Sequence, residues 1–240
     1  YVISETHAAG PDLARLVELV APSAAGRLLD VATGGGHVAL ALAPHAGLTV
    51  ASDLTLAMLV EARRFMTDRG FPVVVCCAAD AEHLPFGEAS FTAVTCRIAL
   101  HHVPAIERAL GEVYRVLAPG GCFGFVDSMV PDDLKLAEFL NHVERLRDPT
   151  HVRSRTRSEW IALLEAAGFH IEAAEVFKKT HAFASWAGRS SQLDAAGRQA
   201  LEEEFLSAPS EVAEYFRYEV ADGRLVSYTD DKLLLLGRKG

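Results

Sequence analysis

Apolar and polar positions alternate along the chain in blocks that predict strands followed by helices. Continuous apolar runs indicate buried strands, and the blocks between them repeat apolar residues at helical spacing. The predicted order is helix 11–22, strand 27–32, helix 36–43, strand 48–52, helix 55–69, strand 73–77, strand 91–98, helix 104–117 and strand 121–127. This alternation predicts an α/β fold, a doubly wound and mostly parallel sheet with helices on both faces.

The pattern after residue 130 is more helical and ends in an apolar run. It predicts helix 133–147, helix 158–167, strand 169–177, two or three short helices within 184–217, and closing strands within 224–238. A chain of 240 residues with 50% hydrophobic content is long enough for one full α/β core. We therefore expect a single domain, 1–240, with a helical cap.

The segment 28–43 carries the strongest functional pattern, because an apolar strand leads into a glycine cluster and then an apolar helix. Glycines 34–36 allow a sharp turn that brings the backbone close to a ligand. Asp30 adds a carboxylate just below the turn. A carboxylate there favours a ligand with an ammonium or sulfonium charge over a phosphate.

Charged residues also follow the next strands. Asp53 and Asp80 lie at or beyond the ends of the second and third strands, and Arg97 ends the fourth. Parallel strands place these ends along one edge, where open α/β sheets bind ligands. Asp53 is suited to hold both hydroxyls of a ribose, and Asp80, followed by Ala81, is placed to accept a hydrogen bond from an adenine amino group. Each acid alone could equally be a helix cap or a solvated loop residue.

Composition narrows the function classes. The formal net charge of -9 argues against a nucleic-acid partner. No apolar run approaches the length of a membrane span, and we expect a cytoplasmic protein. The four cysteines show no CxxC spacing, so we assign no metal ligands. The sequence makes no prediction of an oligomeric state.

Six segments together carry a family resemblance: 30–36 (DVATGGG), 52–58 (SDLTLAM), 79–86 (ADAEHLPF), 91–97 (FTAVTCR), 100–103 (LHHV) and 114–121 (YRVLAPGG). In this order and spacing the chain resembles class I S-adenosylmethionine-dependent methyltransferases of the small-molecule type, related to the ubiquinone and menaquinone C-methyltransferases. The resemblance implies a Rossmann-like seven-stranded sheet with an antiparallel last strand. It also implies a cofactor-binding core over 25–130, an N-terminal cap helix within 1–24 and a substrate lid over 178–224.

The resemblance implies S-adenosyl-L-methionine as cofactor. The glycine turn would hold its methionine part, Asp53 its ribose and Asp80 its adenine, with Leu54 and Met58 lining the adenine pocket. Ala32 stands where many members have their first glycine. The implied cofactor-binding residues are Asp30, Ala32, Thr33, Gly34, Gly36, Asp53, Leu54, Met58, Asp80, Ala81 and Arg97.

The implied reaction is an in-line displacement, so alignment and exclusion of water can supply much of the rate. His101 follows the fourth strand and is the candidate catalytic residue, as a general base or substrate contact. The alternative is that His101 and His102 pack under the next helix. His7 and His151 are further candidates for the lid, and Arg153 and Arg155 form either an acid-binding or a solvated basic loop.

We therefore expect methyl transfer to an O, C or N atom of a small-molecule substrate. The alternative is a protein that binds S-adenosylmethionine without transferring its methyl group. A nicotinamide dehydrogenase shares the glycine turn, but Asp30 and the Asp80 segment argue against it. Methylation of DNA bases is disfavoured by the negative charge and by the sequence 97–100 (RIAL), which replaces an Asn/Asp-Pro-Pro-aromatic run.

Overall fold

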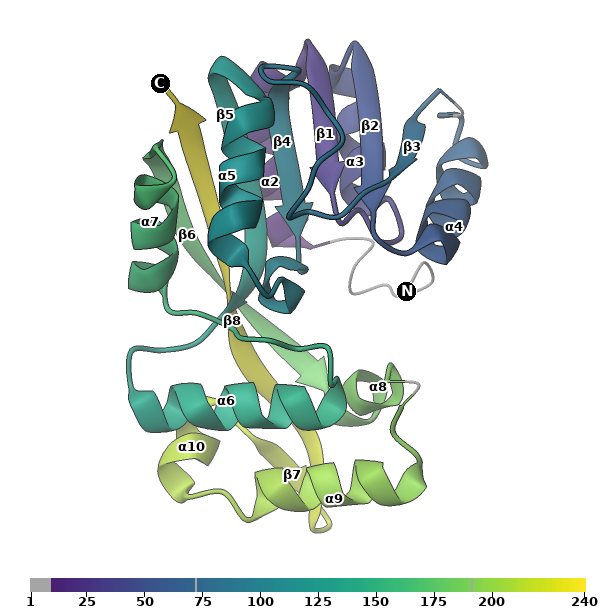
Figure 1. Ribbon diagram of the computed structural model, residues 1–240. Helices are drawn as coiled ribbons and strands as arrows, with labels where there is room; N and C mark the ends of the chain where they lie inside the picture. Colours follow the sequence, from purple (N-terminus) through teal and green to yellow (C-terminus); the bar gives the residue numbers. More distant parts are fainter. Residues whose placement is uncertain (1–9, 72, 191) are drawn as a thin grey trace.

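One sheet runs through the whole structure, a computed structural model that describes residues 10–71, 73–190 and 192–240 (Figure 1). Its strand order is β3-β2-β1-β4-β5-β8-β6. The first five strands pair in parallel, and β8 lies antiparallel between β5 and β6. The bounds are β1 Arg27–Val31, β2 Leu48–Asp53, β3 Val75–Ala78, β4 Phe91–Arg97, β5 Leu117–Met129, β6 Phe169–Ala182 and β8 Arg224–Lys239.

The predicted α/β fold with an antiparallel last strand is confirmed. The sheet has one strand more than the seven implied, because β7 (Glu219–Ala221) pairs with β8 outside the main order. The sequence missed this strand because it is only three exposed residues long, too short for a period-two pattern to show.

Helices cover both faces of the sheet, as the alternation predicted. Successive strand residues point to opposite faces, so Leu28 and Leu29 enter two different apolar clusters. Leu29 packs with Phe123, Phe125 and Trp160 on one face, and Leu28 packs beneath the N-terminal helix on the other. The helices around the sheet are α2 Pro11–Ala24, α3 His37–Leu42, η1 Ala43–His45, α4 Leu56–Thr67, η2 Leu100–His102, α5 Ile106–Val116 and α7 Arg157–Ala166.

A second lobe lies below the sheet and has its own apolar core (Figure 1). We call it the cap lobe: helices α6 Leu134–Arg147, α8 Phe183–Gly188, α9 Ala195–Leu206 and α10 Ser210–Tyr215, with β7. Strands β6 and β8 run from the main sheet into this lobe, paired from Phe169↔Lys239 to Ala182↔Ser227. The expected lid at 178–224 therefore differs from the cap lobe in two ways. Residues 178–182 belong to β6, and α6, which precedes residue 178, is part of the lobe. In the described part of the chain, every helix is too short or too polar to cross a membrane.

The helix expected as an N-terminal cap packs directly on the sheet. Leu16 and Val20 of α2 are fully buried, and the helix lies against β5. At Gly124 of β5, a Cβ atom would lie 2.5 Å from Val20 Cγ2 and 2.9 Å from Leu16 Cδ1. A glycine is therefore needed for this close approach.

Gly124→Ala should destabilise the fold by about 1–3 kcal/mol, because the added methyl group overpacks this contact. Gly111→Ala is the matched control: Gly111 lies within α5, and nothing lies within 4 Å of its Cβ position. It should stabilise by about 0.5–1 kcal/mol through helix propensity. Urea unfolding of both variants checks this, and an unchanged Gly124→Ala would contradict the packing argument.

Candidate functional site

The glycine turn after β1 has a left-handed backbone at three positions. The φ angles are 51° at Ala32, 52° at Gly34 and 81° at Gly36. A Cβ at Gly36 would lie 3.2 Å from the Cβ of Ala62, so a side chain there would be crowded as well as conformationally strained. Ala32 tolerates a conformation that favours glycine, which accounts for the glycine that many members of the resembled family carry there.

The carboxylate of Asp30 lies buried beneath this turn, 1% exposed. Its two oxygens accept hydrogen bonds from Thr33 Oγ1 (2.6 Å) and Thr95 Oγ1 (2.7 Å). Burial raises the pKa of Asp30 to about 6, because these hydrogen bonds replace only part of its hydration. At neutral pH the turn therefore rests on a poorly solvated negative charge, and a cationic ligand would stabilise it.

Asp53 joins the end of β2 to the glycine turn. Its Oδ2 accepts from the Gly34 backbone N–H (2.9 Å), and its Oδ1 accepts from that of Thr55 (2.8 Å). Each oxygen keeps a further lone pair that can accept from a ligand hydroxyl. Next to Asp53, Leu54 is 75% exposed, which leaves an apolar side chain beside the turn.

The structure brings five of the predicted cofactor residues around one cavity, the turn cavity. They are Asp30, Ala32, Thr33, Gly34 and Arg97, and Gly35, His37, Val38 and Ile98 complete its lining. The other six lie around the turn or beyond it. Asp53 bonds to Gly34, the Met58 Cε atom lies 4.0 Å from the Gly34 Cβ position, and Gly36 ends the turn. Leu54 is exposed, and Asp80 and Ala81 follow β3, where Ala79 N–H donates to the Asp53 carbonyl (3.0 Å).

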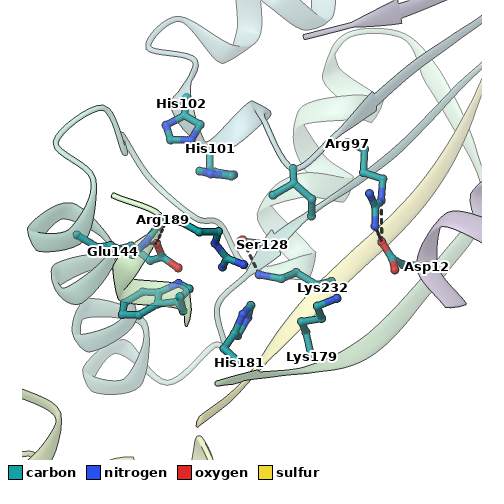
Figure 2. Close-up of a pocket in the computed structure, with 13 residues that line it drawn as sticks. Asp12, Arg97, His101, His102, Ser128, Glu144, Lys179, His181, Arg189 and Lys232 are labelled. Carbon is teal, nitrogen blue, oxygen red and sulfur yellow. Dashed lines mark hydrogen bonds and ion pairs between the residues drawn. The ribbon is translucent and has the colours of Figure 1, made fainter. Parts of the chain in front are cut away.

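A second cavity, the cap cavity, lies where the sheet edge meets the cap lobe (Figure 2). Arg97 and Ile98 line both cavities, so the two adjoin at the end of β4. Ile98 has a φ of 56°, a strained conformation for a β-branched residue. Its backbone N–H donates to the Val126 carbonyl (2.7 Å), which holds the strained residue on β5. The cap cavity lining is Asp12, Arg97, Ile98, His101, His102, Ser128, Glu144, Arg147, Lys179, His181, Trp186, Arg189 and Lys232.

His101, the predicted catalytic residue, lines the cap cavity and is held by Asp127 at the end of β5. Its Nδ1 lies 2.5 Å from Asp127 Oδ1, and its backbone N–H donates to Asp127 Oδ2 (3.0 Å). Burial raises the pKa of Asp127, but the His101 charge and hydrogen bonds from His101 and Ser128 outweigh it and lower this pKa below its usual value. An ionised Asp127 requires a proton on Nδ1. In neutral His101 the Nε2 atom is then a proton acceptor.

The neighbouring histidines lie in different surroundings. His102 also lines the cap cavity, and burial lowers its pKa. His151 is buried, with Nε2 bonded to Asn141 Oδ1 (2.9 Å), and burial followed by the His101 charge lowers its pKa to about 4. Both are therefore neutral at pH 7. His7 lies outside the described residues.

The two arginines of the basic loop lie outside the cap cavity lining. Arg153 pairs with Glu159, and Arg155 stacks over Trp160. Both arginines of this loop therefore contact side chains of α7.

Sequence reasoning missed most of the cap cavity. Asp127 could have been found, because it ends the predicted strand 121–127 just as Asp53 directly follows the predicted strand 48–52. The charges of 230–232 (DDK) directly before the Leu233–Leu236 run were a second signal, since charges inside a buried strand require partners. Asp12 on α2 carried no such signal. It pairs with Arg97 at 2.7 Å.

Known proteins are similar to this chain in sequence and in structure. A family profile described as a methyltransferase domain matches residues 29–125. The uncharacterized methyltransferase YcgJ of Bacillus subtilis (strain 168) is 40% identical over 166 residues, which are 69% of this chain and 66% of YcgJ. The demethylmenaquinone methyltransferase of Thermus thermophilus is 46% identical over 110 residues, which are 45% of this chain and 49% of that protein. This chain thus spans about half to two thirds of these curated relatives.

A crystal structure of a candidate methyltransferase from Bacillus halodurans C-125 matches nearly the whole fold. The TM-score is 0.92 at 40% sequence identity, over 96% of this chain and 99% of that one. The similarity therefore includes the cap lobe as well as the sheet.

Asp30→Asn should stabilise the ligand-free protein at pH 7 by about 1–3 kcal/mol. The folded-state pKa near 6 exceeds the ordinary value of 3.8, so folding favours the protonated acid. The stability that the protonated Asp30 contributes is fully present below about pH 4 and is lost as the pH rises through about 6. Asparagine removes that dependence, and the two threonine hydroxyls can rotate to pair with it.

Urea unfolding at pH 5 and pH 7.5 measures this difference. Glu88→Gln, in an exposed turn, controls for the change in net charge. A loss of stability in Asp30→Asn at pH 7.5 would contradict the proposed cost of the buried charge.

Proposed function

This chain belongs to the class I S-adenosylmethionine-dependent methyltransferases, and we propose that it methylates an acidic hydroxyl group of a small-molecule acceptor held in the cap cavity. One observation carries the proposal: His101, held by the buried Asp127, lines a cavity that adjoins the turn cavity at Arg97 and Ile98. The cofactor and the acceptor would then meet at the end of β4.

The residues of the turn cavity fit S-adenosylmethionine. The Asp30 carboxylate supplies the negative charge that a sulfonium or ammonium group needs. The left-handed glycines leave space for a ligand against the backbone, and the spare lone pairs of Asp53 suit two ribose hydroxyls. Exposed Leu54 offers an apolar surface beside them, as an adenine ring requires.

The cofactor, when bound, supplies an electrophilic methyl group. His101 Nε2 would accept the proton from the acceptor hydroxyl, because Asp127 holds Nδ1 protonated and stabilises the imidazolium that forms. Ser128 and the His101 backbone hold Asp127 in turn, through their N–H groups. The cap lobe covers the cavity, and Trp186 in its lining helps to exclude water.

Binding of S-adenosylmethionine should depend on Asp53. Asp53→Ala should raise its dissociation constant about tenfold or more, because a charge-assisted hydrogen bond contributes about 1.5–3 kcal/mol. Calorimetry on this variant and on Asp68→Ala, an exposed aspartate after α4, tests the assignment. Unchanged affinity in Asp53→Ala would remove the ribose role, and tighter binding of NADH than of S-adenosylmethionine would remove the cofactor proposal.

His101→Ala should reduce turnover by roughly 10²-fold while the affinity for S-adenosylmethionine stays nearly constant. Release of S-adenosylhomocysteine against a panel of phenols, enols, amines and thiols identifies the acceptor atom first. His170→Ala, on the exposed side of β6, is the control.

Wild-type turnover in a folded His101→Ala protein would disprove the base role. Cofactor binding without any methyl release across the panel would instead favour a protein that uses the ligand without transferring its methyl group.

A further inference from the structure

His102 lies beside His101 in the lining of the cap cavity, and a separate set of hydrogen bonds holds its ring. We propose that His102 Nε2 is a second fixed hydrogen-bond acceptor of this site. The preferred substrate then carries two donors on neighbouring atoms: the reacting hydroxyl at His101 and a second O–H or N–H at His102. This proposal rests on the proposed function, which makes the cap cavity the site of the methylated substrate.

A chain of three side chains holds the His102 ring. Its Nδ1 atom lies 3.0 Å from Thr150 Oγ1. Thr150 donates to Asp148 Oδ1 from its hydroxyl (2.7 Å) and from its backbone N–H (2.9 Å). Burial raises the pKa of Asp148, but these two hydrogen bonds outweigh it and lower this pKa below its usual value. Asp148 is therefore ionised at neutral pH and can only accept hydrogen bonds.

The ionised Asp148 determines the tautomer of His102. A hydroxyl group has a single proton, and that of Thr150 is directed to Asp148. Thr150 Oγ1 can therefore only accept from the imidazole, which places a proton on His102 Nδ1. Burial lowers the pKa of His102, so the ring is neutral at pH 7 and Nε2 carries a lone pair. Among the residues that the structure describes, none forms a hydrogen bond with this Nε2 atom.

His101 presents the same kind of atom from an independent set of contacts. Asp127 holds its Nδ1 atom protonated, which leaves Nε2 as the hydrogen-bond acceptor. The centroids of the two imidazole rings lie 4.1 Å apart. Figure 2 shows the rings next to each other among the lining residues. Rings this close can be reached from neighbouring atoms of one small molecule.

The other histidines nearby occupy different positions. The His151 ring centroid lies 5.3 Å from that of His101, but His151 is 3% exposed and lies outside the cavity lining. His181 lines the cavity on the far side from His101, where its Nε2 atom bonds to Asp230 (3.1 Å). His101 and His102 are therefore the adjacent pair among the lining histidines.

The second hydrogen bond would discriminate between substrates. A substrate with a single donor leaves one of the two Nε2 atoms without a partner in a cavity that the cap lobe covers. Because His102 is half-buried, we expect a preference of about fivefold or more for a substrate with both donors.

The same pairing would limit the reaction to one methyl group. Transfer replaces one substrate O–H bond by an O–CH₃ bond, and the proton passes to His101 Nε2. The product then has one donor fewer and should bind more weakly than the substrate. A dihydroxy substrate should therefore leave the site as its monomethyl ether.

Calorimetry on the full chain saturated with S-adenosylhomocysteine tests the proposal. The probes are catechol, phenol and 2-methoxyphenol, used without oxygen. Catechol should bind about fivefold or more tightly than the other two, because it alone carries two adjacent O–H donors. His102→Phe keeps an aromatic ring beside His101 but has no ring nitrogen, so catechol should lose this advantage.

Two further variants complete the test. Thr150→Val nearly keeps the side-chain shape but lacks the hydroxyl that fixes the His102 tautomer. The preference for catechol should fall about threefold in this variant, which keeps the test open if His102→Phe does not fold. His45→Phe, exposed in η1, is the control and should keep the full preference.

Equal binding of the three probes to the wild-type chain would overturn the proposal. So would a full preference for catechol in both His102→Phe and Thr150→Val. If His102→Phe weakens S-adenosylmethionine instead of catechol, the ring serves the cofactor and the proposal fails.

Release of S-adenosylhomocysteine separates this proposal from the proposed function. Equal binding of the probes together with release would reject the second donor and retain methyl transfer. The expected preference for catechol without any release would retain the two-donor site and reject methyl transfer.

Discussion

The burial of the Asp127 carboxylate is the constraint on which the site depends. This side chain is completely inaccessible to solvent, so its charge persists only because three N–H groups surround it. Two of them belong to His101, one from its ring and one from its backbone. The same carboxylate thus positions the loop after β4 and sets the tautomer of the imidazole, which couples the end of β5 to the chemistry at β4.

Two carboxylates border the turn cavity. Asp30 lines it, and Asp53 accepts a hydrogen bond from the backbone of Gly34 in its lining. The Arg97–Asp12 pair lies close to the border between the two cavities, with both side chains less than 10% exposed. The two carboxylates beside the turn cavity are therefore complementary to a cationic donor.

The core of the fold could be predicted from local patterns, whereas the acceptor site could not. The strands, the glycine turn and the acids at strand ends follow from periodicity and chain order alone. The cap cavity instead combines Asp12 near the start of the described chain with Lys179 and Lys232, which lie on strands that continue past the sheet. Strand β6 continues to residue 182, inside the expected lid at 178–224. The sequence did not reveal this, because residues 178–182 (KKTHA) are mostly polar and show no alternation of apolar and polar positions.

The long β6–β8 ribbon also determines how the two lobes can move and unfold. A continuous ladder of backbone hydrogen bonds crosses from the sheet into the cap lobe, where an enzyme with a flexible hinge would have loops. Motion between the lobes must bend or twist this ribbon as an elastic element. Because the lobe is assembled from separate stretches of chain, it has no contiguous segment that could be excised or exchanged as a module, and we expect the lobes to share one cooperative unfolding transition.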